Sequence, residues 1–415
     1  MISVEEALER ILSYVPVLEP VDVPILDALG QAMAEDVVAT FDIPPLDNTA
    51  MDGYAVRAAD TTGATAETPR TLRVTGELAA GYIFDGTVEP GTAVRIMTGA
   101  PIPTGADAIV PFEETDEPEG RGFGSFAKSR DTVGIMKAAL PGANIRYAAE
   151  DVRRGQAIIR RGAVIGPPQA GVLASLGNTH VRVHRRPVIA ILSTGDEVRD
   201  PGQPLRPGQI YDSNAYSIAA MVLANGGMPK RLGIARDTVE ELTAKIRAGL
   251  DADMLVTSAG VSRGDYDVVK DVLAKEGEVD FWTVRMRPGK PLAFGAFPSG
   301  GRRVPHIGLP GNPVSSMVSF ELFGRPAIYK MLGRHDWQRP RVRAIAEEPI
   351  LNLDARRVFA RAIVTRRDDR WYAALTGPQG SGILTSMAEA NALAIVPEDV
   401  PGIAAGDEVD AILLD

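Results

Sequence analysis

The chain has 415 residues, of which 45% are hydrophobic and 24% charged, and its net charge is −10. This composition is typical of a soluble globular protein, and the length suggests about three domains of ~150 residues each. The absence of cysteine excludes disulfides and thiolate metal sites, and the acidic balance argues against a nucleic-acid partner. No apolar stretch can span a membrane and no signal-peptide pattern is present, so we expect no membrane partner and a cytoplasmic location.

The N-terminal part of the chain predicts two structural segments. Ser3 and Glu6 have the spacing of a capping box, so a helix is expected to begin there. Prolines and glycines then break the chain into short β-type runs, which predict a compact β domain over residues 47–141. The runs cover residues 71–75, 93–98 and 108–111. We expect this domain to be inserted into a discontinuous N-terminal α+β domain of residues 1–46 and 142–180.

The second half begins with alternating strands and helices. This order predicts a doubly wound, mainly parallel α/β domain over residues 181–333. The expected strands cover residues 188–192, 230–235, 254–258, 281–285 and 291–294. The expected helices cover residues 213–224, 238–250 and 266–275, with another from Pro313. Short β runs then predict a C-terminal β domain over residues 334–415, so the fold class is multidomain α/β plus β.

Four polar loops adjoin strands of the α/β domain. Their sequences are STGDE (193–197), TSAGVSRGDYD (257–267), RPGKP (287–291) and LPGNPVSS (309–316). Open α/β sheets bind ligands at the carboxyl ends of their strands, where glycines let the backbone approach an anion. The loops therefore predict one site. Its candidate substrate-binding residues are Ser193, Gly195, Ser258, Gly260, Ser262, Arg287, Lys290, Pro310, Asn312 and Ser315.

Acidic residues at the same expected edge suggest a magnesium site. Glu197, Asp237 and Asp267 follow three of the expected strands, and converging carboxylates are typical Mg²⁺ ligands. An alternative exists for Asp237, because Asp237 and Glu240 also have the spacing of a capping box.

Two of the loops suit an anion. Prolines and a glycine make the RPGKP turn stiff, and its Arg287 and Lys290 suit a tetrahedral oxyanion or a phosphate. LPGNPVSS leads into a helix, so hydroxyls and free amides are expected to point the same way. The alternative for PGNP is a plain turn with proline at the helix start.

The N-terminal half adds weaker candidates. Asp52 lies in DNTAMDGYA, Thr98 is the first residue of the loop TGAPIPTGAD, and Asp151 lies in AEDVRRG. The alternative is structural, because turns are commonly rich in Asp, Asn and Gly.

Seven motifs occur in one order along the chain: DNTAMDGYAVR, TGAPIPTGADAIV, STGDE, GQIYDSN, AGVSRGDYD, RPGKP and GLPGNPVSS. Together they make the chain resemble the molybdopterin molybdotransferase family of the MoeA type, which includes the E domain of gephyrin-like proteins. The resemblance implies a four-domain homodimer whose active site lies at the subunit interface. It also implies that molybdate is inserted into adenylylated molybdopterin with Mg²⁺-dependent release of AMP, giving molybdenum cofactor. An adenylyltransferase and acceptor molybdoenzymes are possible partners.

The resemblance also assigns residues. The family's functional acids match Asp52, Asp151, Glu197, Asp237 and Asp267, and its hydroxyl position matches Thr98. Two positions depart from the family pattern, which often has glycine at Ala259 and lysine at Arg287. The methyl group of Ala259 is expected to narrow backbone access to phosphate. The forked Arg287 leaves the choice between molybdate and tungstate open.

Two other functions remain as alternatives. A molybdopterin adenylyltransferase shares the α/β core but consumes ATP. A non-enzymatic scaffold of the gephyrin kind would cluster partner proteins through the same domain.

Overall fold

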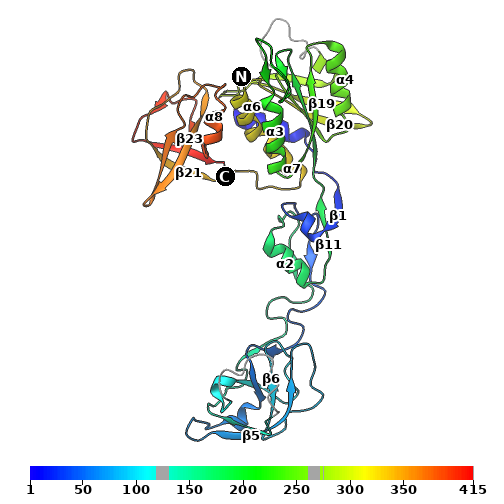
Figure 1. Ribbon diagram of the computed structural model, residues 1–415, viewed down its shortest axis with the longest axis vertical. Helices are drawn as coiled ribbons and strands as arrows, with labels where there is room; N and C mark the ends of the chain where they lie inside the picture. Colours follow the sequence, from blue (N-terminus) through cyan, green and yellow to red (C-terminus); the bar gives the residue numbers. More distant parts are fainter. Residues whose placement is uncertain (118–129, 260–271, 274, 415) are drawn as a thin grey trace. The chain divides into compact units, whose positions relative to one another are not determined.

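The computed structural model describes residues 1–117, 130–259, 272–273 and 275–414 (Figure 1). Its internal contacts divide the chain into two compact units. The core unit comprises Met1–Glu35 and Arg161–Asp415, and the inserted unit comprises Asp36–Arg160. The four domain boundaries expected from the sequence stay predictions. None of the helices in the described ranges has the length and apolarity needed to cross a bilayer.

The inserted unit is built on a five-stranded sheet of order β7-β4-β6-β5-β8. Both of its faces are buried, since Tyr54 and Val56 belong to one apolar cluster and Ala55 to another. The main strands are β4 (Gly53–Val56), β5 (Arg70–Leu78), β6 (Thr92–Ile96), β7 (Ala108–Pro111) and β8 (Thr132–Ile135). The shorter elements are β2 (Val37–Val38), β3 (Asn48–Thr49), η2 (Ala58–Thr61), η3 (Phe112–Glu114), β9 (Ile145–Arg146) and β10 (Ala157–Ile159).

The core unit begins with helix α1 (Val4–Tyr14). The Ser3 hydroxyl accepts a hydrogen bond from the Glu6 amide at 3.0 Å, which confirms the predicted helix start. Strand β1 (Pro20–Pro24) pairs antiparallel with β11 (His180–His184). Beside this pair lie η1 (Ile25–Ala28) and α2 (Pro167–Ser175).

A six-stranded mixed sheet of order β15-β12-β16-β20-β19-β17 forms the centre of the core unit. Its first four strands are parallel to one another. Strand β19 pairs antiparallel with β20, and β17 pairs antiparallel with β19. The strands are β12 (Val188–Thr194), β15 (Met228–Ala235), β16 (Met254–Ser258), β17 (Glu278–Thr283), β19 (Pro291–Ser299) and β20 (Arg302–Leu309). The predicted mainly parallel sheet is therefore confirmed, and the carboxyl ends of β12, β15, β16 and β20 share one edge.

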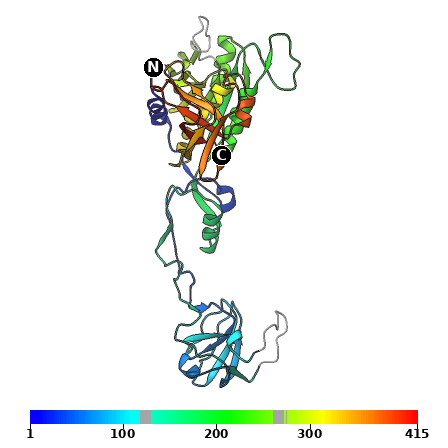
Figure 2. The ribbon, with the colours of Figure 1, turned by 90° about the vertical axis from the view of Figure 1, so that its left-hand side faces the viewer.

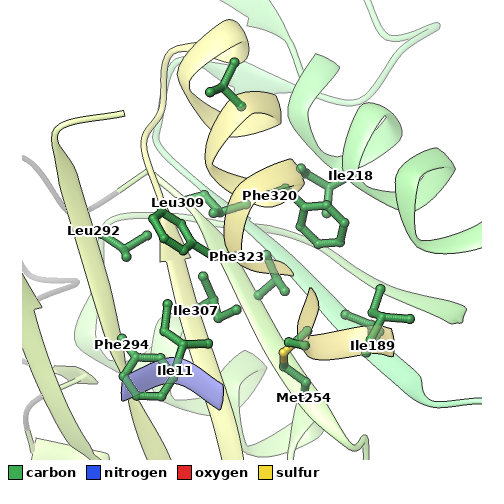
Figure 3. Packing of buried hydrophobic residues seen from close by; sticks show 14 of the residues in the cluster. Ile11, Ile189, Ile218, Met254, Leu292, Phe294, Ile307, Leu309, Phe320 and Phe323 are labelled. Atoms are coloured by element: carbon green, nitrogen blue, oxygen red, sulfur yellow. The ribbon is translucent and has the colours of Figure 1, made fainter. Parts of the chain in front are cut away.

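Helices cover both faces of this sheet (Figure 1). Ile189 and Ile191 of β12 belong to one apolar cluster, whereas Ala190 and Leu192 belong to the cluster on the opposite face. Because both faces are buried, the strand has the continuous apolar run expected of a parallel sheet. Figure 3 shows the larger cluster, where α1 and the helices after β20 pack on the sheet. The helices are α3 (Ser213–Ala224), α4 (Val239–Gly249), α6 (Pro313–Ser319), η4 (Phe320–Gly324) and α7 (Arg325–Met331).

The C-terminal strands form a second six-stranded sheet, orange to red in Figures 1 and 2. Its order is β18-β23-β24-β21-β27-β25, and β25 pairs back onto β23, which closes the sheet into a barrel. Strand β18 (Met286–Arg287) pairs with β23 and leads into the RPGKP turn (287–291), which we call the basic turn. The other elements are β21 (Arg341–Ala346), β22 (Ile350–Leu351), β23 (Arg357–Arg367), β24 (Arg370–Leu375), α8 (Thr385–Glu389), β25 (Ala392–Val396), β26 (Gly402–Ile403) and β27 (Glu408–Leu413).

Two of the predicted helices differ from the sequence prediction or cannot be compared with it. Helix α4 is capped by Thr238, whose hydroxyl accepts from the Glu241 amide at 3.4 Å, so the predicted capping role of Asp237 is wrong. The alternative fails because the chain enters the helix one residue later than the Asp–Glu spacing suggests. Most of the helix expected over residues 266–275 lies outside the described residues.

Candidate functional site

A cavity of about 620 Å³ lies at the carboxyl edge of the parallel strands, and we call it the sheet-edge cavity. Three of the predicted loops line it: the segment after β12, the end of β16 and the segment after β20. The basic turn contributes Pro291. The predicted candidates that line the cavity are Ser193, Glu197, Ser258, Pro310, Asn312 and Ser315. Residues distant in sequence therefore converge because their strands run parallel.

The loop after β12 requires a glycine at its centre. Gly195 has φ +129°, and a Cβ placed on it would lie 2.5 Å from Oε2 of Glu197. The Glu197 carboxylate thus packs directly against the backbone of Gly195, which leaves no room for a side chain at that position. Among the described residues the buried hydroxyl of Ser193 has no hydrogen-bond partner, so a polar group is left for a ligand or a small rearrangement to satisfy.

At the end of β16, the sequence leads us to expect that the methyl group of Ala259 narrows backbone access to phosphate. Ala259 has φ +79°, an uncommon conformation for a residue with a side chain. Its amide donates to the Leu309 carbonyl at 3.1 Å, and a Cβ on Gly311 would lie 3.3 Å from its methyl group. The amide is therefore occupied by the neighbouring strand. The candidates Gly260 and Ser262 lie outside the described residues.

The segment after β20 combines the two interpretations made from the sequence. Pro313 occupies the first turn of α6, as the turn interpretation expects, and Ser315 lines the cavity. The prediction of free amides is wrong for Val314, whose N–H donates to the Ser381 carbonyl at 3.1 Å. The reason is tertiary, since Ser381 comes from the C-terminal part of the chain.

The basic turn lines the cavity through Pro291, whereas its two cations, Arg287 and Lys290, are not among the lining residues. Gly289 has φ +98°, and a Cβ on it would lie 2.6 Å from Oγ of Ser319, so the turn packs against α6. Ser319 follows Ser315 by four residues, which is roughly 6 Å along a helix. Lys290 is exposed, Arg287 is half-buried, and neither forms an ion pair with any carboxylate among the described residues.

The acidic candidates occupy three different settings. Asp237 follows β15 and is exposed, and the described lining of the cavity does not include it. In the inserted unit, Oδ1 of Asp52 accepts from both the amide and the hydroxyl of Thr98, each at 2.6 Å. Asp151 is exposed, and its amide donates to the Ile43 carbonyl at 3.0 Å. Asp267 lies outside the described residues.

The cavity has two further contributions that were not among the predicted site residues, and one of them comes from the GQIYDSN motif (208–214). Asp212 caps α3 by accepting from the Ala215 amide at 3.0 Å, and Asn214 follows it. Gly382 reaches the cavity from the C-terminal part of the chain. The loop before it is held by the buried guanidinium of Arg361, which donates to the Gly380 carbonyl at 3.0 Å, and burial lowers the pKa of Arg361.

The donor set fits a hard cation such as Mg²⁺. The described lining supplies the carboxylates of Glu197 and Asp212 and the unpartnered hydroxyl of Ser193, all of them oxygen donors. A group of three or more His, Cys, Asp or Glu side chains arranged for a metal is absent from the part of the chain that the structure describes. Protein oxygens would thus hold such an ion together with substrate oxygens or water.

Comparisons with known proteins agree along the whole chain. The MoeA N-terminal region (domain I and II) matches residues 2–177, a "Probable molybdopterin binding domain" matches residues 190–330, and the MoeA C-terminal region (domain IV) matches residues 343–414. Molybdopterin molybdenumtransferase 2 of Mycobacterium tuberculosis is 39% identical over 99% of this chain and 98% of its own length. The molybdopterin molybdenumtransferase of Nostoc sp. is 36% identical over 99% of this chain and 93% of its own.

Solved structures give the same result. The molybdopterin biosynthesis MoeA protein of Pyrococcus horikoshii superposes with a TM-score of 0.83 at 32% identity, covering 100% of this chain and 99% of the other. The fold and the cavity thus define a protein of the molybdenum cofactor biosynthesis class. The chain belongs to the MoeA family.

Proposed function

We propose that the protein inserts molybdate into adenylylated molybdopterin in the sheet-edge cavity, which yields molybdenum cofactor and AMP. The protein is an enzyme of the transferase class. The observation that carries the proposal is the convergence of Glu197, Ser258 and Ser315 on one cavity, next to a turn with two cations. The cavity offers groups that suit phosphates, and the turn offers charge that suits an oxyanion.

The roles follow from position. The hydroxyls of Ser258 and Ser315 bind oxygens of the pterin nucleotide, with Ser193, Pro310 and Asn312 forming the surrounding wall. Arg287 and Lys290 hold molybdate close to the dithiolene, which brings together two anions that otherwise repel each other. Gly195 keeps the Glu197 carboxylate at the cavity.

Mg²⁺ is the proposed metal, with Glu197 as a ligand and Asp212 as a neighbouring oxygen donor. When bound, it supplies Lewis-acid stabilisation of charge that develops on the adenylyl phosphate. Asp237 and Asp267, ligands by family resemblance, complete the proposed set. In the described chain, Glu197 supports this assignment as the one residue of the proposed set of Glu197, Asp237 and Asp267 that lines the cavity, and Asp212 lines it beside Glu197.

The proposed enzyme is a homodimer whose active site lies at the subunit interface. Asp52 and Asp151 are assigned to the partner's contribution, and Thr98 matches the family's hydroxyl position. What supports the pairing of Asp52 with Thr98 is their double hydrogen bond, which holds the carboxylate in place before any substrate arrives.

The test is AMP release by the purified chain supplied with adenylylated molybdopterin, Mg²⁺ and molybdate. We expect release to depend on molybdate, and Glu197→Ala to abolish it while Asp196→Ala, the adjacent exposed acid, leaves it intact. Equal activity of the two variants would contradict the assignment. Consumption of ATP with molybdopterin would support the adenylyltransferase instead. A folded wild type with neither activity would support the scaffold.

A further inference from the structure

Asn214 joins three segments of the sheet-edge cavity. It is the second residue of α3 and only 8% exposed. Its Nδ2 donates to the Gly311 carbonyl at 2.8 Å and to Oγ of Ser258 at 2.7 Å. One amide group therefore ties the start of α3 to the end of β16 and to the segment after β20.

The orientation of this amide is fixed by chemistry. The Gly311 carbonyl can only accept, so a flipped amide would place Oδ1 of Asn214 against another acceptor at 2.8 Å. Nδ2 must therefore face Gly311. Its second hydrogen then goes to Ser258, whose Oγ acts as the acceptor.

The hydrogen bond from Asn214 determines whether the Ser258 hydroxyl acts as a donor or an acceptor toward the cavity. The Ser258 hydroxyl accepts from Asn214, and its own proton finds no acceptor among the described residues. Ser258 is 3% exposed and lines the cavity. Its carbonyl already accepts from Oγ1 of Thr194 at 3.3 Å, and the next amide, that of Ala259, is bonded to Leu309.

We propose that Asn214 is a positioning residue that sets Ser258 as a hydrogen-bond donor to an acceptor oxygen of the bound pterin nucleotide. The inference rests on the proposed function, because that function places the ligand in this cavity. The acceptor is a phosphate oxygen, either on the adenylyl half or on the pterin half. Separate probes for the two halves distinguish these sources.

The experiment is a double-mutant cycle read by ligand affinity. The dissociation constants of AMP and of molybdopterin are measured by calorimetry for the wild type, Asn214→Ala, Ser258→Ala and the double variant. Loss of the donor is expected to weaken one probe about tenfold, or about 1.4 kcal/mol. If Asn214 acts through Ser258, the double variant is no weaker than Ser258→Ala alone. Additive losses, or no loss for either probe in Ser258→Ala, would overturn the proposal.

The control is a second buried asparagine, Asn225, which is the C-cap of the same helix. Asn225 is 7% exposed and its Nδ2 donates to the Met221 carbonyl at 2.7 Å, at the end of α3 that does not line the cavity. Asn225→Ala is expected to lower the unfolding temperature without changing either dissociation constant. A matching loss of affinity in this control would show a general effect on the helix and count against the specific role.

A further variant keeps the proposal testable if Asn214→Ala does not fold. Ser258→Cys nearly conserves volume but donates weakly, so it should lose affinity as Ser258→Ala does. Wild-type affinity in Ser258→Cys would refute the donor role. Failure of the proposed function is recognised separately, as a wild type without molybdate-dependent AMP release. An active wild type with additive losses rejects only the role of Asn214.

Discussion

A buried histidine that stays neutral in the folded protein is expected to lower the free energy of unfolding of the core unit below neutral pH. His306 in β20 is fully buried, with Nε2 3.0 Å from Oγ1 of Thr257 and its ring edge-on to Phe297. Burial lowers the pKa of His306 from 6.5 to about 3. The unfolded chain takes up a proton below about pH 6.5 and the folded chain does not, so stability falls as pH falls from about 7 toward 3. Between pH 7 and pH 5 the loss is about 2 kcal/mol.

Urea unfolding followed by tryptophan fluorescence measures this loss. All three tryptophans, Trp282, Trp337 and Trp371, belong to the core unit, so the signal reports on the unit that contains His306. We expect His306→Gln to remove about 2 kcal/mol of the change between pH 7 and pH 5. The exposed His180 supplies the control, His180→Gln, which should behave as the wild type. If the free energy of unfolding changed equally between pH 7 and pH 5 in the wild type and in His306→Gln, the reasoning would be refuted.

Three other predictions concern the site. Gly195→Ala adds backbone strain of about 1–3 kcal/mol and displaces the Glu197 carboxylate, so AMP release should fall. The control is Gly202→Ala, because Gly202 has φ +89° but a Cβ on it meets nothing within 4 Å, so AMP release should fall less. Equal activities of the two variants would contradict the contact between Gly195 and Glu197. Asp52→Asn keeps an oxygen for the two hydrogen bonds but removes the charge, so AMP release should fall about tenfold with an unchanged unfolding temperature. Unchanged release would argue against a role for that charge. Lys290→Ala should raise the half-saturating molybdate concentration roughly tenfold and leave molybdopterin affinity unchanged; parallel losses would argue against an oxyanion role.

The sheet edge could be predicted from the sequence because its signals are local. Apolar runs followed by Gly-rich polar loops identify the carboxyl ends of buried strands, and parallel pairing then brings Glu197, Ser258 and Ser315 together. The Ser3 cap and the start of α6 at Pro313 were also predictable, since both depend on neighbours within one helical turn.

The missed features depend on distant neighbours. The Ala259 amide is occupied by Leu309, fifty residues further on, and the Val314 amide by Ser381. No local pattern distinguishes an occupied amide from a free one. Asn214 belongs to the GQIYDSN motif, but Asp212, two residues earlier, explains that segment sufficiently as a helix cap, so Asn214 was not predicted as a site residue. Arg361 lies inside β23, and no local pattern indicates that its guanidinium holds the loop before Gly382.

A crystal structure of the protein soaked with AMP, Mg²⁺ and molybdate is the most direct test that the cavity beside β12, β16 and β20 is where the cofactor is completed. The account predicts the AMP phosphate within hydrogen-bond distance of Ser258 or Ser315, the metal on Glu197 and the oxyanion at Lys290. Ligands bound in full elsewhere, with these side chains left uncontacted, would contradict it.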